Sequence, residues 1–288
     1  MKRLATLLIL FSTVVPLQGQ LALPGLYTDH AVGGGISPTA LAATSRLWYR
    51  IPLAEQRGAL WDPAKIDLGV RNQLSPAFEE IGAYFYWEPV AVFDLTVSVA
   101  ARQTFTLFDA GFYEVAGYDA PYDDLADRGE DRSRSGFRFT VAPRLKAAYA
   151  RFVALNELRV DVFDFGSNVA EPGERYFYEP VNDTILRFQD TVVANTFLLL
   201  YSLTPELLLG GQYYLRSVPD SGAVSHRFSG MAVYSQPLQE RLSLFAALLS
   251  GSYAGDRYHA GSFYLAGQVG FQAKVWAPRE SAPPSQAD

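Results

Sequence analysis

Apolar and polar residues alternate along most of this chain. In the segment FDLTVSVAARQTF, residues 93–105, apolar side chains occupy positions 93, 95, 97, 99 and 101, and Asp94, Thr96, Ser98 and Arg102 lie between them. Successive side chains of a strand face opposite sides of a sheet, so the pattern predicts a strand with one apolar and one polar face. In a soluble sandwich the apolar face is the core, whereas in an outer-membrane barrel it meets lipid.

The same period of two recurs along the sequence. Regular alternation marks segments around 65–71, 137–149, 157–162 and 263–275, and less regular candidates cover 41–51, 78–88, 187–202, 207–217, 226–236 and 241–253. Together with residues 93–102 these make eleven predicted strands, and a weaker twelfth is expected around 26–34. The alternative is ten strands, with the N-terminal part forming a plug or a periplasmic segment.

The predicted connections sort by length. After Trp87 short and longer connections alternate over nine strands, with long ones at 108–135 and 166–186 and medium ones at 218–225 and 254–262. Alternate connections of an up-and-down barrel lie at opposite ends, and outer-membrane barrels have short periplasmic turns and longer external loops. The segments 117–135 and 168–183 are rich in charged residues, Gly and aromatics, and we expect them to be solvated external loops.

The two ends of the chain differ from the rest. Residues 1–20, MKRLATLLILFSTVVPLQGQ, combine basic Lys2 and Arg3 with an apolar run to Val15 and then Pro16, which predicts a signal peptide cleaved between Gln18 and Leu23. Residues 21–276 are then the predicted barrel. Residues 277–288, beginning APRESAPP, show no periodicity and are expected to be a disordered tail.

Composition narrows the function classes. The chain has no Cys, 17 Tyr and 19 Phe, and without Lys2 and Arg3 it holds 22 basic against 30 acidic residues, a net charge of −8. That acidic balance argues against a nucleic-acid partner. After the N-terminal run the longest apolar stretch, near 192–203, is too short for a spanning helix, so a membrane span would have to be made of strands.

Taken together, these features resemble those of Gram-negative outer-membrane β-barrel proteins. The resemblance rests on the signal peptide, the alternating strands, the connection lengths and strand-end aromatics, and it covers almost all of the mature chain. Those aromatics are Trp48, Tyr49, Trp87, Tyr213, Tyr214 and Trp276. It implies an all-β, transmembrane, antiparallel up-and-down β-barrel in the outer membrane, a monomer in contact with outer-membrane lipids and the barrel assembly machinery.

If the apolar faces meet lipid, the charged residues between them share the lumen. The predicted lumen-lining residues are Arg71, Asp94, Arg102, Arg138, Arg144, Lys146, Glu157, Arg159 and Asp161. The basic members come from consecutive strands and would form a positive wall that favours anions in a narrow pore. The competing interpretation is that they close the lumen with salt bridges and nothing passes. Eleven or twelve strands would make a soluble barrel too wide to fill with apolar side chains, which favours the membrane.

Catalytic and metal chemistry find little support. A lipid hydrolase or acyltransferase would need a Ser and a His on one face, but His226 and Ser229 in SHRFSG are three apart and should face opposite sides. His30 and His259 are expected in loops, and no cofactor or metal site is predicted. Acidic residues in 117–131 lack a calcium-loop spacing.

The sequence therefore predicts a narrow, anion-preferring pore for small solutes, or a structural or surface-interaction barrel. The alternatives are a membrane-embedded lipid hydrolase and a soluble, secreted β-barrel or sandwich that binds a ligand.

Overall fold

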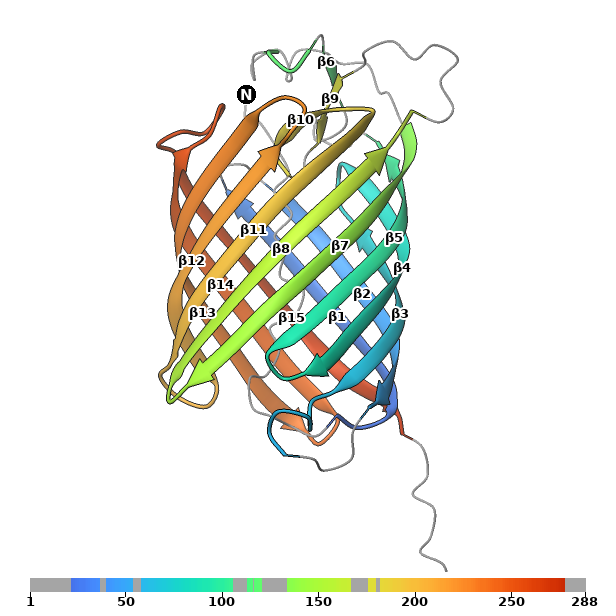
Figure 1. Ribbon diagram of the computed structural model, residues 1–288, viewed down its shortest axis with the longest axis vertical. Helices are drawn as coiled ribbons and strands as arrows, with labels where there is room; N and C mark the ends of the chain where they lie inside the picture. Colours follow the sequence, from blue (N-terminus) through green and yellow to red (C-terminus); the bar gives the residue numbers. More distant parts are fainter. Residues whose placement is uncertain are drawn as a thin grey trace, which may run out of the picture.

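A single closed sheet dominates the computed structural model, which describes residues 22–36, 40–53, 58–105, 113–115, 117–120, 134–166, 176–179 and 182–277. Twelve antiparallel strands form a barrel, with strongly tilted strands (Figure 1). They are β1 (Gly25–Ile36), β2 (Ala40–Pro52), β3 (Lys65–Leu74), β4 (Phe78–Val90), β5 (Phe93–Thr104), β7 (Arg134–Tyr149), β8 (Phe152–Asp164), β11 (Gln189–Ser202), β12 (Leu207–Val218), β13 (Ala223–Gln239), β14 (Leu242–Gly255) and β15 (Phe263–Trp276).

The strands follow an up-and-down order around the barrel. Each pairs with its predecessor and successor in the wall, and β1 closes the sheet by pairing with β15, with Leu26 opposite Trp276 and Ile36 opposite Leu265. The predicted twelve-stranded barrel is confirmed, including the weak N-terminal strand, which is β1. The ten-stranded alternative is wrong, because β1 and β2 are both part of the wall.

The apolar face of the strands points outward. On β5, Val99 is 52% exposed, whereas Ser98 and Arg102 are buried inside the barrel. The same holds on other strands, where Phe137, Leu158 and Leu248 are exposed to the outside. A closed barrel pairs the backbone groups of its strands, so such an exterior is compatible with hydrocarbon.

An exterior of this kind does not fit the soluble alternative. Large apolar side chains are exposed on every strand of the wall, and charged side chains fill the interior. Soluble monomers rarely expose apolar patches larger than a few hundred Å². The part of the chain that the structure describes contains no helix long and apolar enough to cross a membrane.

The two ends of the barrel differ in their connections. The connections 105–133, 165–188 and 256–262 lie at one end, called here the long-loop end; 91–92, 150–151, 203–206 and 240–241 lie at the other, the short-turn end. The strand termini Gly25 and Trp276 are at the short-turn end. The separation by length is incomplete. The connections 37–39, 75–77 and 219–222, at the long-loop end, have only three or four residues, and 53–64, at the short-turn end, is longer than its neighbours.

Aromatic side chains gather around the outside of the short-turn end. Tyr49, Trp87, Tyr149, Tyr201 and Trp276 all lie near the strand ends there and are exposed on the outer surface. Outer-membrane barrels carry such aromatic girdles at the membrane interface. Trp48 and Tyr214, which the sequence grouped with this set, are instead buried inside the barrel, because they fall on the other face of their strands.

Three short strands form a second, small sheet that the sequence did not predict. It consists of β6 (Tyr113–Val115), β9 (Tyr176–Glu179) and β10 (Thr184–Arg187), with β9 pairing with both others. These strands belong to the connections after β5 and β8, and Figure 1 shows them at the upper opening of the barrel, the long-loop end. This small sheet brings the two longest connections together over the lumen.

The outward orientation can be tested with one charge. Val99 lies at the centre of β5 on the outer face. Val99→Arg should lower the free energy of unfolding in lipid vesicles by about 2–4 kcal/mol, whereas Gln103→Arg, on the same face near the strand end, should cost only about 0–1 kcal/mol. Urea titrations of the refolded barrel measure both. Equal losses in the two variants would contradict the assigned membrane position of β5.

Candidate functional site

One carboxylate organises much of the inner wall. Glu80 on β4 is fully buried and accepts hydrogen bonds from Arg71 on β3, from Arg102 on β5 at 2.8 and 3.0 Å, and from Arg138 on β7 at 2.5 Å. Four adjacent strands therefore meet at a single anion. One negative charge among three guanidinium groups leaves a local positive excess, which a low-dielectric interior penalises strongly.

A second cluster lies on the same side of the barrel, toward the short-turn end. Asp94 on β5 contacts Arg144 at 3.0 Å and Lys146 at 2.9 Å, and Glu88 on β4 bonds both Lys146 and Lys65 at 2.5 Å. Acids and bases alternate here across strands β3, β4, β5 and β7. With Glu157 on β8, which lies 4.0 Å from Arg144, the cluster holds three acids and three bases and is electrically balanced.

All nine predicted lumen-lining residues occupy inward positions of the closed barrel, and each takes part in at least one ion pair. The remaining pairs are Arg159 with Asp161, at 2.8 Å, and Glu157 with Arg144, at 4.0 Å. The basic stripe that the sequence suggested therefore does not form an uncompensated positive wall. The salt bridges of the competing interpretation are present, but sequence reasoning did not identify their main anion, Glu80, which lies in a strand of irregular alternation.

The segment expected to be a solvated loop enters the barrel instead. We call β9, its turn and β10 the inner hairpin. Its side chains from Tyr176 to Glu179 and from Asn182 to Leu186 are buried. Phe177 and Leu186 pack in one apolar cluster with Phe163, Val192 and Val218 on the inner wall. The interpretation of residues 168–183 as a wholly external loop is therefore wrong for the described part of this segment.

Polar contacts fix the inner hairpin to the charged wall. Glu179, fully buried, forms an ion pair with Arg102, and its other oxygen accepts hydrogen bonds from the backbone and side chain of Asn182 at 2.6 and 2.9 Å. Asn182 in turn accepts a hydrogen bond of 3.0 Å from Arg159. Glu179 thus supplies a second negative charge to the group of arginines around Glu80.

The turn of the inner hairpin is held from the opposite side. Arg216 on β12 donates a hydrogen bond of 2.9 Å to the backbone oxygen of Asp183, and Tyr178 donates one of 2.5 Å to its carboxylate. His259, in the β14–β15 connection, lies with Nε2 3.0 Å from Asp183 Oδ2. His259 is in a loop as expected, and the structure gives it an ionic partner that the sequence could not reveal. His30, also expected in a loop, lies in β1.

Protonation of this pair follows from its surroundings. Burial lowers the pKa of His259, but the hydrogen bond and charge of Asp183 raise it more, and the net pKa is raised. Burial raises the pKa of Asp183, but His259, Arg216 and Tyr178 together leave that pKa lowered. The two groups therefore favour an ion pair that fastens the hairpin turn to the rim.

The described outer loops add further contacts at the long-loop end. Tyr118 donates a hydrogen bond of 2.8 Å to Asp190, and Arg257 donates one of 2.6 Å to the backbone oxygen of Tyr118. Tyr258 donates to the backbone oxygen of Ala120 at 3.1 Å. The β5–β7 and β14–β15 connections thus bond to each other, and the β5–β7 connection also bonds to the start of β11.

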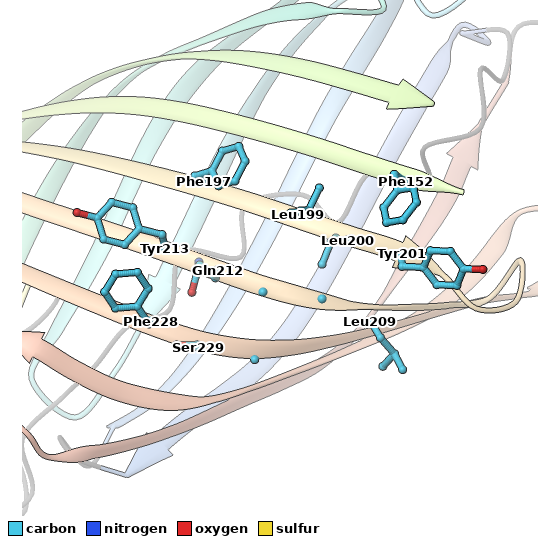
Figure 2. Close-up of a pocket in the computed structure, with 13 residues that line it drawn as sticks. Phe152, Phe197, Leu199, Leu200, Tyr201, Leu209, Gln212, Tyr213, Phe228 and Ser229 are labelled. Carbon is cyan, nitrogen blue, oxygen red and sulfur yellow. The ribbon is translucent and has the colours of Figure 1, made fainter. Parts of the chain in front are cut away.

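A groove of about 620 Å³ lies on the outside of the wall, across β11, β12 and β13. Figure 2 shows Phe197, Tyr213 and Phe228 at one end of it and Phe152 and Tyr201 at the other. Gly211 and Gly230, paired in register, form its floor. Its lining is almost wholly apolar and it faces the lipid side, so it is suited to acyl chains and is no solute site.

The structure separates the residues of the only hydrolase candidate. Ser225 and Ser229 point into the barrel, whereas His226 is on the outer face and contacts the Tyr213 hydroxyl at 2.7 Å. A Ser–His pair is therefore not formed in this motif. Among the described residues no group of three or more His, Cys, Asp or Glu is arranged to hold a metal ion.

Comparisons with known proteins agree with the fold. No family model matches the sequence, and the search of curated proteins gives no match. Similar solved structures include the β domain of the Bordetella autotransporter BrkA (11% identity over 88% of this chain and 100% of that one, TM-score 0.48), the outer-membrane protein Omp33 of Acinetobacter baumannii (9%, 88% and 100%, TM-score 0.41) and the KdgM porin (9%, 86% and 98%, TM-score 0.40). None of them assigns a role to a residue of this chain.

The protein is an outer-membrane type of β-barrel, as its own geometry shows. Its twelve strands close on themselves, its exterior is largely apolar, and six of the seven buried Lys and Arg residues of the described chain form salt bridges inside it. The inner hairpin occupies the long-loop end of its lumen.

The role of Glu80 can be tested by removing its charge. Glu80→Gln leaves Arg71, Arg102 and Arg138 without their shared anion and should lower the free energy of unfolding by about 3–5 kcal/mol, since breaking a buried pair strands the remaining charge. Glu79→Gln, next in sequence on the outer face and bonded only to Asn72 among the described residues, should cost about 1 kcal/mol or less. Similar losses in both variants would show that Glu80 does not organise the wall.

The His259–Asp183 pair predicts a pH dependence of hairpin protection. The contribution of His259 is complete below its ordinary pKa of 6.5 and is lost as pH rises through its raised value, whereas that of Asp183 is lost as pH falls below 3.8. Hydrogen-exchange protection factors of residues 176–187 should therefore be highest between pH 3.8 and pH 6.5, and they should fall as the pH rises through the raised pKa of His259. His259→Gln should abolish the fall at high pH, and His30→Gln should preserve it; an unchanged profile in His259→Gln would contradict the assignment.

Proposed function

We propose that the protein is a narrow outer-membrane pore that the inner hairpin closes, and that it conducts small solutes when the hairpin leaves the lumen. One observation carries the proposal: Glu179 of the hairpin is fully buried and paired with Arg102 of the wall. A carboxylate on a loop element that supplies the second negative charge to the three arginines of the wall can both occupy the lumen and be released from it.

The form of the attachment suits a reversible closure. The hairpin meets the wall mainly through Glu179, Asn182, Asp183 and one apolar cluster, and only four residues of β9 and four of β10 are in strands. The barrel strands, by contrast, pair over ten or more residues each. Elements with few contacts open at lower free energy than the core of a fold. The hairpin is therefore the part of the lumen most able to move.

Orientation and partners complete the proposal. The long-loop end is assigned to the cell exterior and the short-turn end to the periplasm, because outer-membrane barrels have longer external loops. Export through the predicted signal peptide, assembly by the barrel assembly machinery and a monomeric state belong to the same proposal. The predicted signal peptide, and the predicted tail after residue 277, lie outside the described residues.

Selectivity of the open pore would not come from the basic stripe. Arg102, Arg138, Arg144, Lys146 and Arg159 are all paired with carboxylates, so that side of the wall offers a solute both signs of charge. A barrel whose balanced lumen never opens is the competing function, a structural barrel. Conductance separates the two.

Glu179→Gln should increase the open time of single channels in planar bilayers several-fold over the unaltered protein, because it removes the charge by which the hairpin pairs with Arg102. Deletion of residues 176–186 should give a permanently conducting barrel. Glu79→Gln is the matched control and should behave like the unaltered protein. Heat-modifiable migration on gels confirms that each variant is folded. If both hairpin variants are folded but show no conductance in planar bilayers, the protein is a structural barrel instead.

A further inference from the structure

Arg227 on β13 differs from every other buried cation of the described chain. Seven Lys and Arg residues are buried there, and six of them form salt bridges: Lys65, Arg102, Arg138, Arg144, Arg159 and Arg216. Arg227, 9% exposed, has no carboxylate of any described residue within salt-bridge distance. An unpaired charge in a protein interior is costly unless something compensates it.

Tyrosine rings surround this guanidinium. Its central carbon lies 4.3 Å from the ring centre of Tyr264, 4.6 Å from that of Tyr214 and 5.7 Å from that of Tyr253. Cation–π contacts attract the guanidinium to the ring faces, but each supplies far less than a full negative charge. The rings therefore hold Arg227 in place without neutralising it.

Polar atoms without partners lie around the same point. Arg227 Nε and the hydroxyl oxygens of Ser229, Tyr253 and Tyr264 are buried and make no hydrogen bond to the described residues. The side-chain oxygen of Gln212 also has no partner there. Strand register brings these groups together, since Arg227 is opposite Tyr214 and Tyr253, and Ser229 is opposite Gln212 and the side-chain-free Gly251.

Donors dominate this set, which points to an acceptor with negative charge. Arg227 and the three hydroxyls can all donate hydrogen bonds, and buried polar groups in proteins are normally paired. A guanidinium presents its donors in a planar fork that matches two oxygens of a carboxylate or phosphate. The chemistry of the cluster is thus that of an anion receptor.

We propose that Arg227, with Ser229, Tyr253 and Tyr264, forms a lumenal binding site for a carboxylate or phosphate group. The site lies on β13–β15, across the barrel from the paired basic stripe on β5, β7 and β8. Tyr253 also contacts the ring of His259, with ring centres 5.2 Å apart, which places the site beside the attachment of the inner hairpin. Only the further step, that the bound anion is a passing solute, rests on the proposed function.

Binding of inorganic phosphate and of acetate to the refolded barrel in detergent tests the site without requiring conductance. Calorimetric titration at constant ionic strength should show one saturable phosphate or acetate site per barrel. Arg227→Gln should weaken binding by about tenfold or more, which a single lost charge-assisted hydrogen bond can account for. Arg241→Gln, an exposed arginine in the β13–β14 turn, should leave it unchanged.

Further variants separate loss of the site from loss of the fold. Tyr253→Phe combined with Tyr264→Phe keeps Arg227 and its rings but removes two hydroxyls, and should weaken binding several-fold. Arg227→Gln should remain heat-modifiable on gels, because it removes a charge that no described carboxylate balances. The proposal is overturned if the unaltered barrel binds neither anion at concentrations up to about 10 mM, or if Arg227→Gln binds as tightly as the Arg241→Gln control. Anion binding in a barrel that never conducts would refute the pore and leave the site intact.

Discussion

The surrounding lipid confines the ionised side chains of the membrane-spanning strands to the interior of the barrel. A spanning sheet must close to pair its backbone groups, and its outer face must be apolar where it meets hydrocarbon, so charges on the membrane-spanning part of a strand are confined to the lumen. There charges interact strongly, and a charge without a partner is expensive. The dense ion pairs of β3, β4, β5, β7 and β8 follow from that confinement.

The position of the inner hairpin has the same origin. Three arginines converge on Glu80, and the wall itself places no second carboxylate against Arg102; the hairpin provides one in Glu179. Closure of the lumen therefore also reduces the positive excess of the wall, and it is helped by the packing of Phe177 and Leu186 on inward apolar residues. On the opposite wall, Arg227 is the cation for which the described chain supplies no counter-charge, and an external anion is the remaining candidate.

The local sequence pattern predicts the barrel but not the ion pairs and the inner hairpin inside it. Period-two alternation predicts the number of strands and which side chains point outward. Successive residues of a strand point to opposite faces, so Val99 lies outside and Ser98 inside. Ion pairs such as Arg102 with Glu179 join residues 77 apart, and no local signal marks them. The hairpin was missed because its charged and aromatic composition is also that of a solvated loop; only the enclosing wall makes Phe177 and Glu179 buried residues. Arg227 was overlooked for the related reason that absence of a partner is visible only in three dimensions.

Single-cysteine scanning along β5 tests the central claim most directly, since the chain has no native cysteine. A fluorophore attached in turn at residues 96 to 101 would be exposed to a quencher dissolved in the bilayer. The account predicts strong quenching at positions 97, 99 and 101 and weak quenching at 96, 98 and 100. Uniform quenching, or the reverse alternation, would contradict a barrel with lipid outside and charge within.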